Sequence, residues 1–113
     1  MEFVFWENTA KKCPILKEIG KDADLRGKVL KKLEAYKQYK FEDLKKMGLI
    51  EKIKIKNKNK LHELRLGIGK KECRFLFTYK NEKIHLVMFL IKKSNEIKIR
   101  EIEVADGRAG IIL

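Results

Sequence analysis

The chain has 113 residues, of which 44% are hydrophobic and 39% charged, a balance typical of one globular domain rather than of a disordered tail or a membrane protein. The 28 Lys and Arg residues outnumber the 16 Asp and Glu residues, and the resulting net charge of +12 favours polyanionic partners such as nucleic acid. Because 23 of the 28 cations are lysines, a compositional bias of the coding sequence is the alternative explanation.

The N-terminal part is predicted to form one strand and two helices. Residues 2–6 are aromatic and β-branched, which favours a short buried strand. Pro14 suits the first turn of a short helix, and Gly20 suits its end. Either Asp22 or Asp24 can cap the longer helix that follows. Its apolar stripe consists of Leu25, Val29, Leu33 and Tyr36. We expect this stripe to pack on the protein's own sheet, with a partner-binding face as the alternative.

The middle of the chain is predicted to be strongly basic. Residues 41–47 indicate one further helical turn that ends at Gly48. Ile53 and Ile55 then alternate with lysines, which indicates a basic strand or arm that ends in a turn at residues 57–60. The alternating lysines are Lys52, Lys54 and Lys56.

Three further strands are predicted over residues 61–66, 73–79 and 84–91, and an antiparallel meander is their simplest connection. Residues 97–108 carry an apolar residue at every third position, but two glycines near their end weaken a helix. A last helix and an ordered arm therefore both fit this segment. All of these elements are expected to belong to a single domain over residues 1–113.

Two arginines lie inside the predicted strands. Strand parity places Arg65 on the same face as Glu63 and on the opposite face from Leu64. Arg74 lies opposite the aromatic face of its own strand, which we take as the core side. An arginine inside a sheet either pairs with a carboxylate such as Glu63 or binds a phosphate, and the spacing leaves both interpretations open.

Two lysines and two histidines are the other candidates for chemistry. Lys92 and Lys93 directly follow the last predicted strand. Adjacent cations repel each other, which is one route to a lysine that transfers a proton near neutral pH. Two solvated lysines are the alternative. His62 and His85 lie among apolar strand residues, where a packing role is favoured over catalysis.

The two cysteines and the N-terminus indicate a reducing compartment. Cys13 and Cys73 have no neighbouring cysteine, so neither a CxxC motif nor a zinc quartet can form, and free thiols are expected. Residues 1–6 contain no secretory signal, which favours the cytoplasm. We expect no metal and no cofactor.

Four segments of the C-terminal half follow the pattern of a known family in the right order. They are LHELR at 61–65, CRFLFTY at 73–79, FLIKKS at 89–94 and REIEVADGR at 100–108. These segments resemble the L-x-E-L-R, R-x-F/Y, G-F-x-K-K-T and R-E-I-x-x-A-x-x-R motifs of RelE/HigB-type toxins, in particular the phage-derived HigB-like subgroup. Met88, Leu90 and Lys98 depart from the histidine, aromatic residue and proline that are frequent in that family.

The resemblance implies a fold and a biological role. The implied fold is α+β, with a curved, mainly antiparallel sheet of about four strands, two N-terminal helices on one face and an open, basic concave face. The implied role is the toxin of a type II toxin–antitoxin pair that cleaves mRNA on the ribosome or free. Its implied partners are mRNA or the ribosome and an antitoxin, which we expect to be a helix-turn-helix protein.

The resemblance also implies roles for individual residues. The family's catalytic cations correspond to Arg65, Arg74, Lys92 and Lys93. In the expected metal-free reaction the RNA 2′-hydroxyl attacks the adjacent phosphodiester, the arginines stabilise the developing charge and one of the lysines transfers a proton. The residues expected to bind RNA are Lys52, Lys54, Lys56 and Arg108.

Two other functions fit the same sequence. ParE-like toxins share the implied fold and inhibit their target by binding, without a nuclease site. A structural RNA-binding domain is the third possibility, although no exposed aromatic pair is recognisable among the basic residues.

Overall fold

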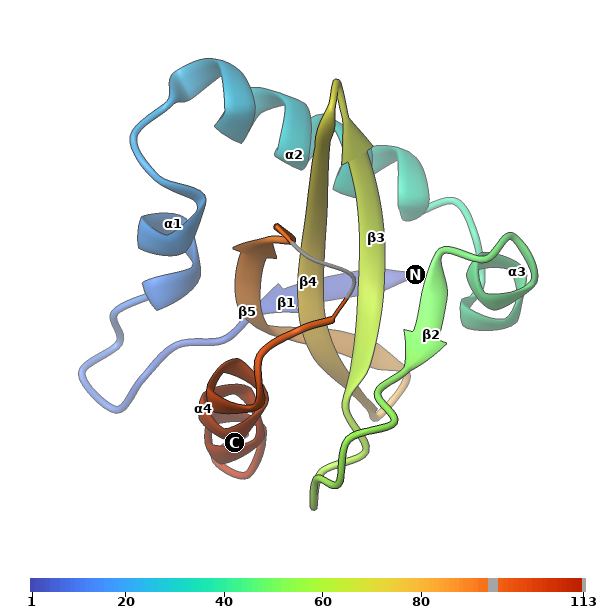
Figure 1. Ribbon diagram of the computed structural model, residues 1–113. Coiled ribbons are helices and arrows are strands. Elements are labelled where there is room, and N and C mark those ends of the chain that lie inside the picture. The colour runs from blue at the N-terminus through green and yellow to red at the C-terminus, as the bar shows by residue number, and fades with distance from the viewer. Residues whose placement is uncertain (94–95, 113) are drawn as a thin grey trace.

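One sheet of five strands, in the order β1-β5-β4-β3-β2, carries helices on both faces (Figure 1). The computed structural model describes residues 1–93 and 96–112. The strands are β1 (Glu2–Phe5), β2 (Ile50–Lys52), β3 (His62–Ile68), β4 (Lys71–Lys80) and β5 (Lys83–Ile91). The helices are α1 (Pro14–Ile19), α2 (Ala23–Tyr36), α3 (Phe41–Lys46) and α4 (Ile99–Ala109). The expected α+β class is confirmed.

Strands β2 to β5 are antiparallel neighbours, and β1 joins them in parallel. The predicted meander is formed by β3, β4 and β5. Strand β2 extends it at one edge by pairing with β3. At the other edge, β1 pairs in parallel with residues 83–86 of β5. The sheet therefore has one strand more than the four that the family resemblance implied.

Local sequence signals explain where the first two helices begin and end. Pro14 occupies the first turn of α1, and Gly20 follows its last residue with a φ of 95°, a left-handed conformation that glycine adopts without strain. The side chain of Asp22 caps α2 by accepting a hydrogen bond from the backbone N–H of Leu25 at 3.1 Å. The predicted stripe of α2 is buried, which confirms that it packs on the protein's own sheet.

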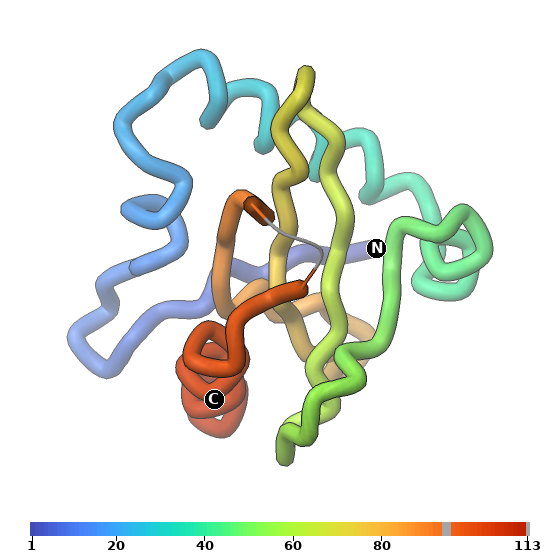
Figure 2. The backbone as a smooth tube through the Cα atoms, viewed as in Figure 1, coloured from blue at the N-terminus to red at the C-terminus, as the bar shows by residue number. Residues whose placement is uncertain are grey.

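The lysine-rich segment after β2 is an arm over residues 53–60, which is one of the two predicted alternatives. Figure 2 shows the arm extending beyond the start of β3. Asn57 shapes the turn, because its side chain accepts from the backbone N–H of Leu61 at 2.9 Å and donates to the carbonyl of Ile55 at 2.8 Å. The carboxylate of Asp106 on α4 accepts from the backbone N–H groups of Lys58 and Asn59 at 2.9 and 3.0 Å. The arm is thereby fastened to α4.

The two faces of the sheet bury two separate apolar cores. The first core lies between the sheet and α1, α2 and α3, and it contains Phe75 and Phe77 of β4. The second core lies between the opposite face and α4, and it contains Leu76 of β4 with Val87 and Met88 of β5. A β-bulge after Leu76 shifts the β4–β5 register, so that two consecutive residues of β5 face the second core.

Residues 99–109 form a helix, which settles the alternatives for this segment. Its buried residues Ile102, Ala105 and Ala109 pack on the face that the resemblance implied to be open. Helix α4 contacts β4 and β5, so the uncovered part of this face lies along β2 and β3. Within the described residues no helix is long and apolar enough to span a membrane.

Candidate functional site

The uncovered part of the second sheet face contains a depression of about 400 Å³. Strand β2, the start of the arm, β3 and the chain around the beginning of α4 surround it (Figure 1). Its charged lining residues are Glu51, Lys52, Lys54, Glu63, Arg65, Lys92 and Glu96. Its apolar lining residues are Ile53, Ile55, Ile97 and Ile102. The second core thus forms part of the wall of a charged, open site.

Strand register brings two arginines and two carboxylates together at this site. Arg65 on β3 lies opposite Arg74 on β4, and Glu51 on β2 lies opposite Glu63 on β3. Like charges directly opposite each other repel. The ion pairs therefore join unlike neighbours, so that Arg65 contacts both Glu51 and Glu63 while Arg74 contacts Glu63.

The carboxylate of Glu63 is shared by the two guanidinium groups. Its Oε1 atom lies 3.4 Å from Nε of Arg65 and 3.7 Å from Nε of Arg74. Within the described residues neither Nε atom has a hydrogen-bond partner, so these contacts are purely electrostatic. Arg74 also donates from Nη1 to the carbonyl of Cys73 at 2.9 Å and lies 3.9 Å from Glu72. Of the two interpretations left open by the sequence, the free protein shows carboxylate pairing.

The two arginines differ in access to solvent. Arg74 is only 8% exposed, and it is not among the lining residues of the depression. The side chain of Arg65 is 42% exposed and lines the depression directly. Arg65 is therefore the arginine that a ligand in the depression can touch.

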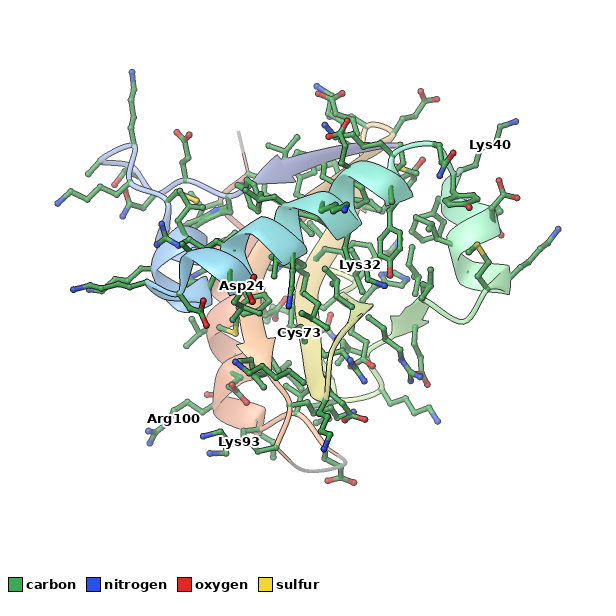
Figure 3. The ribbon with its side chains drawn as sticks, turned by 90° about the horizontal axis from the view of Figure 1, so that it is seen from above. Asp24, Lys32, Lys40, Cys73, Lys93 and Arg100 are labelled. Atoms are coloured by element: carbon green, nitrogen blue, oxygen red, sulfur yellow. The ribbon has the colours of Figure 1, made fainter. Side chains whose placement is uncertain are left out.

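The adjacent lysines after β5 differ in the hollows that they line. Lys92 lies on the side of the second core and lines the depression together with Arg65. Lys93 lines a smaller neighbouring hollow of about 230 Å³, which Lys92 also borders. It lies at the same end of the molecule as Arg100 (Figure 3). Ser94, the last residue of the FLIKKS segment, lies outside the described residues.

The four residues expected to bind RNA divide into two groups. Lys52 and Lys54 line the depression, and Lys56 lies further along the same exposed arm. Arg108 lies elsewhere, in an ion pair with Glu18 at 2.8 Å and a hydrogen bond to the carbonyl of Val87 at 2.8 Å. Its guanidinium carbon also lies 5.4 Å from the ring centroid of Trp6. These contacts indicate that Arg108 stabilises the fold.

Neither histidine lies in the depression. His62 stacks on Phe77 with 5.4 Å between ring centroids, and its Nδ1 lies 2.9 Å from the Lys60 carbonyl oxygen, which accepts the hydrogen bond. His85 lines a different hollow, beside Trp6. Among the described residues no group of three or more His, Cys, Asp or Glu side chains is placed to hold a metal ion. Both cysteines are free, and burial raises the pKa of the Cys73 thiol.

Glu51 is the site residue that sequence reasoning missed. It lies in the three-residue strand β2, directly before the lysine alternation that dominated the sequence pattern. Its relation to Arg65 depends on the register between β2 and β3, which pairs Glu51 with Glu63. The only signal in the sequence was a carboxylate at the start of a basic strand.

Comparison with known families assigns the chain to one family. The model of the family described as phage-derived protein Gp49-like matches residues 19–109, a span that contains Glu51, Glu63, Arg65 and Arg74. The chain belongs to this family, which is RelE-like and associated with the toxins of toxin–antitoxin pairs. No curated protein and no solved structure is significantly similar to the chain.

Proposed function

We propose that the protein is an mRNA endonuclease, the toxin of a two-component pair of the HigB-like kind, acting on the ribosome in the cytoplasm. The observation that supports this proposal most is the exposed guanidinium of Arg65 in a depression that also holds Lys52, Lys54 and Lys92. Such a group of cations suits a phosphodiester and the additional negative charge that develops as it is attacked.

The proposed reaction is an internal transesterification of RNA. The 2′-oxygen forms a bond to phosphorus, and the bond from phosphorus to the 5′-oxygen breaks. Arg65 stabilises the dianionic phosphorane, since its planar guanidinium can donate to two phosphate oxygens at once. Lys92 shares the depression with Arg65 and, as an ammonium, is assigned the donation of a proton to the leaving 5′-oxygen, while the 2′-hydroxyl gives up its proton to water; Lys93 faces the neighbouring hollow.

The lysines at the end of β2 and in the arm are assigned to RNA binding without sequence recognition. Lys52, Lys54 and Lys56 are exposed, and they follow one another along a single segment beside the depression. Contacts of this type fix the position of a phosphate chain. The proposed antitoxin is a helix-turn-helix protein, and an adjacent reading frame of that type would support the pair.

The test is cleavage of a defined mRNA on programmed ribosomes by the purified protein. The expected products end in a 2′,3′-cyclic phosphate and a 5′-hydroxyl. A message methylated at the 2′-oxygen of the cleavage site should stay intact. Growth arrest in cells without cleavage of ribosome-bound or free RNA would contradict the nuclease function.

A toxin that acts by binding alone is the second candidate, and one observation favours it. Both arginines are already paired with carboxylates, and Arg74 is buried. A surface of this kind can dock on a protein target without chemistry. Growth arrest that survives the change Arg65→Lys, with mRNA left intact, would support this candidate.

A further inference from the structure

Two carboxylates that face each other across β2 and β3 hold Arg65 in different ways. Glu51 contacts Nη2 of Arg65 at the surface, where the two side chains are 47% and 42% exposed. Glu63 contacts Nε, and its side chain is only 7% exposed. Exposed ion pairs are weak because water competes for both charges, whereas a buried carboxylate needs its counter-charge to remain ionised. The two contacts must therefore differ in strength.

Arg74 supplies that counter-charge to Glu63. It is buried and does not line the depression, and the register places it directly opposite Arg65. Two guanidinium groups at neighbouring positions repel each other unless a carboxylate lies between them. Glu63 meets this condition, because its Oε1 atom faces the Nε atoms of both arginines. Arg74 can thus influence a ligand in the depression only indirectly, through Glu63 and Arg65.

From this arrangement we infer that Arg65 is the one arginine that binds the RNA phosphate, that Glu51 occupies its place in the free protein, and that Glu63 and Arg74 are positioning residues. This inference rests on the proposed function and refines it. When RNA enters, a phosphate oxygen replaces the Glu51 carboxylate on Nη2, and Glu51 turns to solvent. The buried Glu63–Arg74 pair stays in place and keeps the guanidinium of Arg65 oriented.

Displacement of Glu51 is tested by binding of a short RNA methylated at every 2′-oxygen, which the proposed reaction cannot cleave. Glu51→Gln should tighten binding about two- to fivefold, because the competing carboxylate is gone. In the Arg65→Gln background this gain should vanish. Glu72→Gln is the matched control, since it removes one carboxylate charge that does not contact Arg65. Its small effect should be equal in both backgrounds.

The positioning role is tested by the salt dependence of the same binding. Arg65→Gln should lower the slope of log K against log salt by about 0.7, the amount that one lost phosphate contact to a single strand predicts. The double variant Glu63→Gln/Arg74→Gln replaces the buried charges together, so that neither is left alone. Its slope should equal that of the wild type, while cleavage at saturating RNA falls about tenfold. Arg74→Lys keeps the counter-charge and should restore most of that loss at the same folded fraction.

Two results would overturn the inference. One is an equal gain from Glu51→Gln in the wild-type and Arg65→Gln backgrounds, and the other is a slope that falls in the double variant as it does in Arg65→Gln. In both cases the proposed nuclease function would remain. A wild-type protein without salt-dependent RNA binding would contradict the proposed function itself, and the inference with it.

Discussion

His62 is an imidazole held in an aromatic setting beside two lysines. It stacks on Phe77 and meets Phe41 edge to face, with 5.9 Å between the ring centroids of His62 and Phe41. Burial lowers the pKa of His62, and the charges of Lys45 and Lys52 lower it further, against the opposing effect of the hydrogen bond to the Lys60 carbonyl. The folded state therefore favours the neutral ring.

This lowered pKa predicts a loss of stability in mild acid. Below the ordinary pKa of about 6.5 the unfolded chain binds a proton that the folded chain does not yet bind, so unfolding becomes more favourable as the pH falls. Stability should therefore decline from about pH 6.5 down to the lower folded pKa. Urea midpoints measured between pH 7.5 and 5.5 check this, and His62→Phe should flatten the decline. An unchanged slope in that variant would contradict the assignment.

Arg65→Lys isolates geometry from charge at the proposed reacting centre. The lysine keeps the positive charge but loses the planar pair of donors that grips two phosphate oxygens. We expect RNA affinity to stay within a few-fold and single-turnover cleavage to fall about a hundredfold, equivalent to about 3 kcal/mol. Lys93→Gln is the control outside the depression and should leave cleavage nearly unchanged. Equal cleavage by wild type and Arg65→Lys would remove Arg65 from the mechanism.

At the scale of elements, the two side chains of an ion pair form hydrogen bonds with the backbone of β5 beyond the point where β1 ends. The last main-chain bond to this edge runs from Trp6 N–H to the Leu86 carbonyl at 2.9 Å. Beyond it, Glu18 of α1 accepts from the Phe89 N–H at 3.1 Å, and Arg108 of α4 donates to the Val87 carbonyl. Glu18 and Arg108 also bind each other, so one pair links helices on opposite faces of the sheet.

Breaking this ion pair should lower the stability of the fold, because both side chains are less than a quarter exposed, at 18% for Arg108 and 24% for Glu18. Arg108→Met leaves Glu18 unpaired and should lower the free energy of unfolding by about 2–4 kcal/mol. Lys28→Met, which breaks an exposed pair with Asp24, is the control and should change it by less than about 0.5 kcal/mol. Urea denaturation compares the two, and equal effects would show that the edge link is not structural.

Most elements follow from local sequence signals. The remaining elements depend on contacts with residues that are distant in the sequence. The helix boundaries at Pro14, Gly20 and Asp22 are set by local backbone preferences and capping, independently of tertiary packing. The arm after β2 keeps its alternating apolar and basic pattern yet leaves the sheet, because Asp106 of α4 takes up its backbone N–H groups. Burial alone would raise the pKa of Asp106, but these hydrogen bonds and that from Asn59 outweigh it and lower the pKa. No pattern within the arm reveals this contact.

The cations of the site and Glu63 were predictable from the sequence, but Glu51 was not. Strand parity alone placed Arg65 and Glu63 on one face, away from the first core. The depth of Arg74 and the approach of Glu51 depend on how β4 and β2 align with β3, and register is a property of the whole sheet. The separation of Lys92 from Lys93 likewise required the path of the chain beyond β5.

At the scale of the whole molecule, the effect of where the positive charges lie on RNA binding can be measured separately from the effect of the total net charge. The net charge of +12 is spread widely, since α2 alone carries Lys28, Lys31 and Lys32 around a second hollow. Changing Lys52, Lys54 and Lys56 together to Gln should weaken RNA binding and lower the salt slope by up to about 2, through lost phosphate contacts. The three α2 lysines changed to Gln are the matched control with the same net charge. Equal slopes in the two triple variants would show that only total charge matters.

The parallel pairing of β1 with β5 also sets an order of events during synthesis. Glu2 pairs with Lys83, so β1 must await a partner about 80 positions later, a delay of about 4–16 s at about 5–20 residues per second. Throughout this interval Phe3, Phe5 and Trp6, which pack against the cores of the folded protein, have no sheet to cover them. Nascent chains stalled before β5 should remain sensitive to protease at this segment, and chains that include β5 should resist. A protein proposed to attack translation would thus complete this sheet only after β5 has itself been translated.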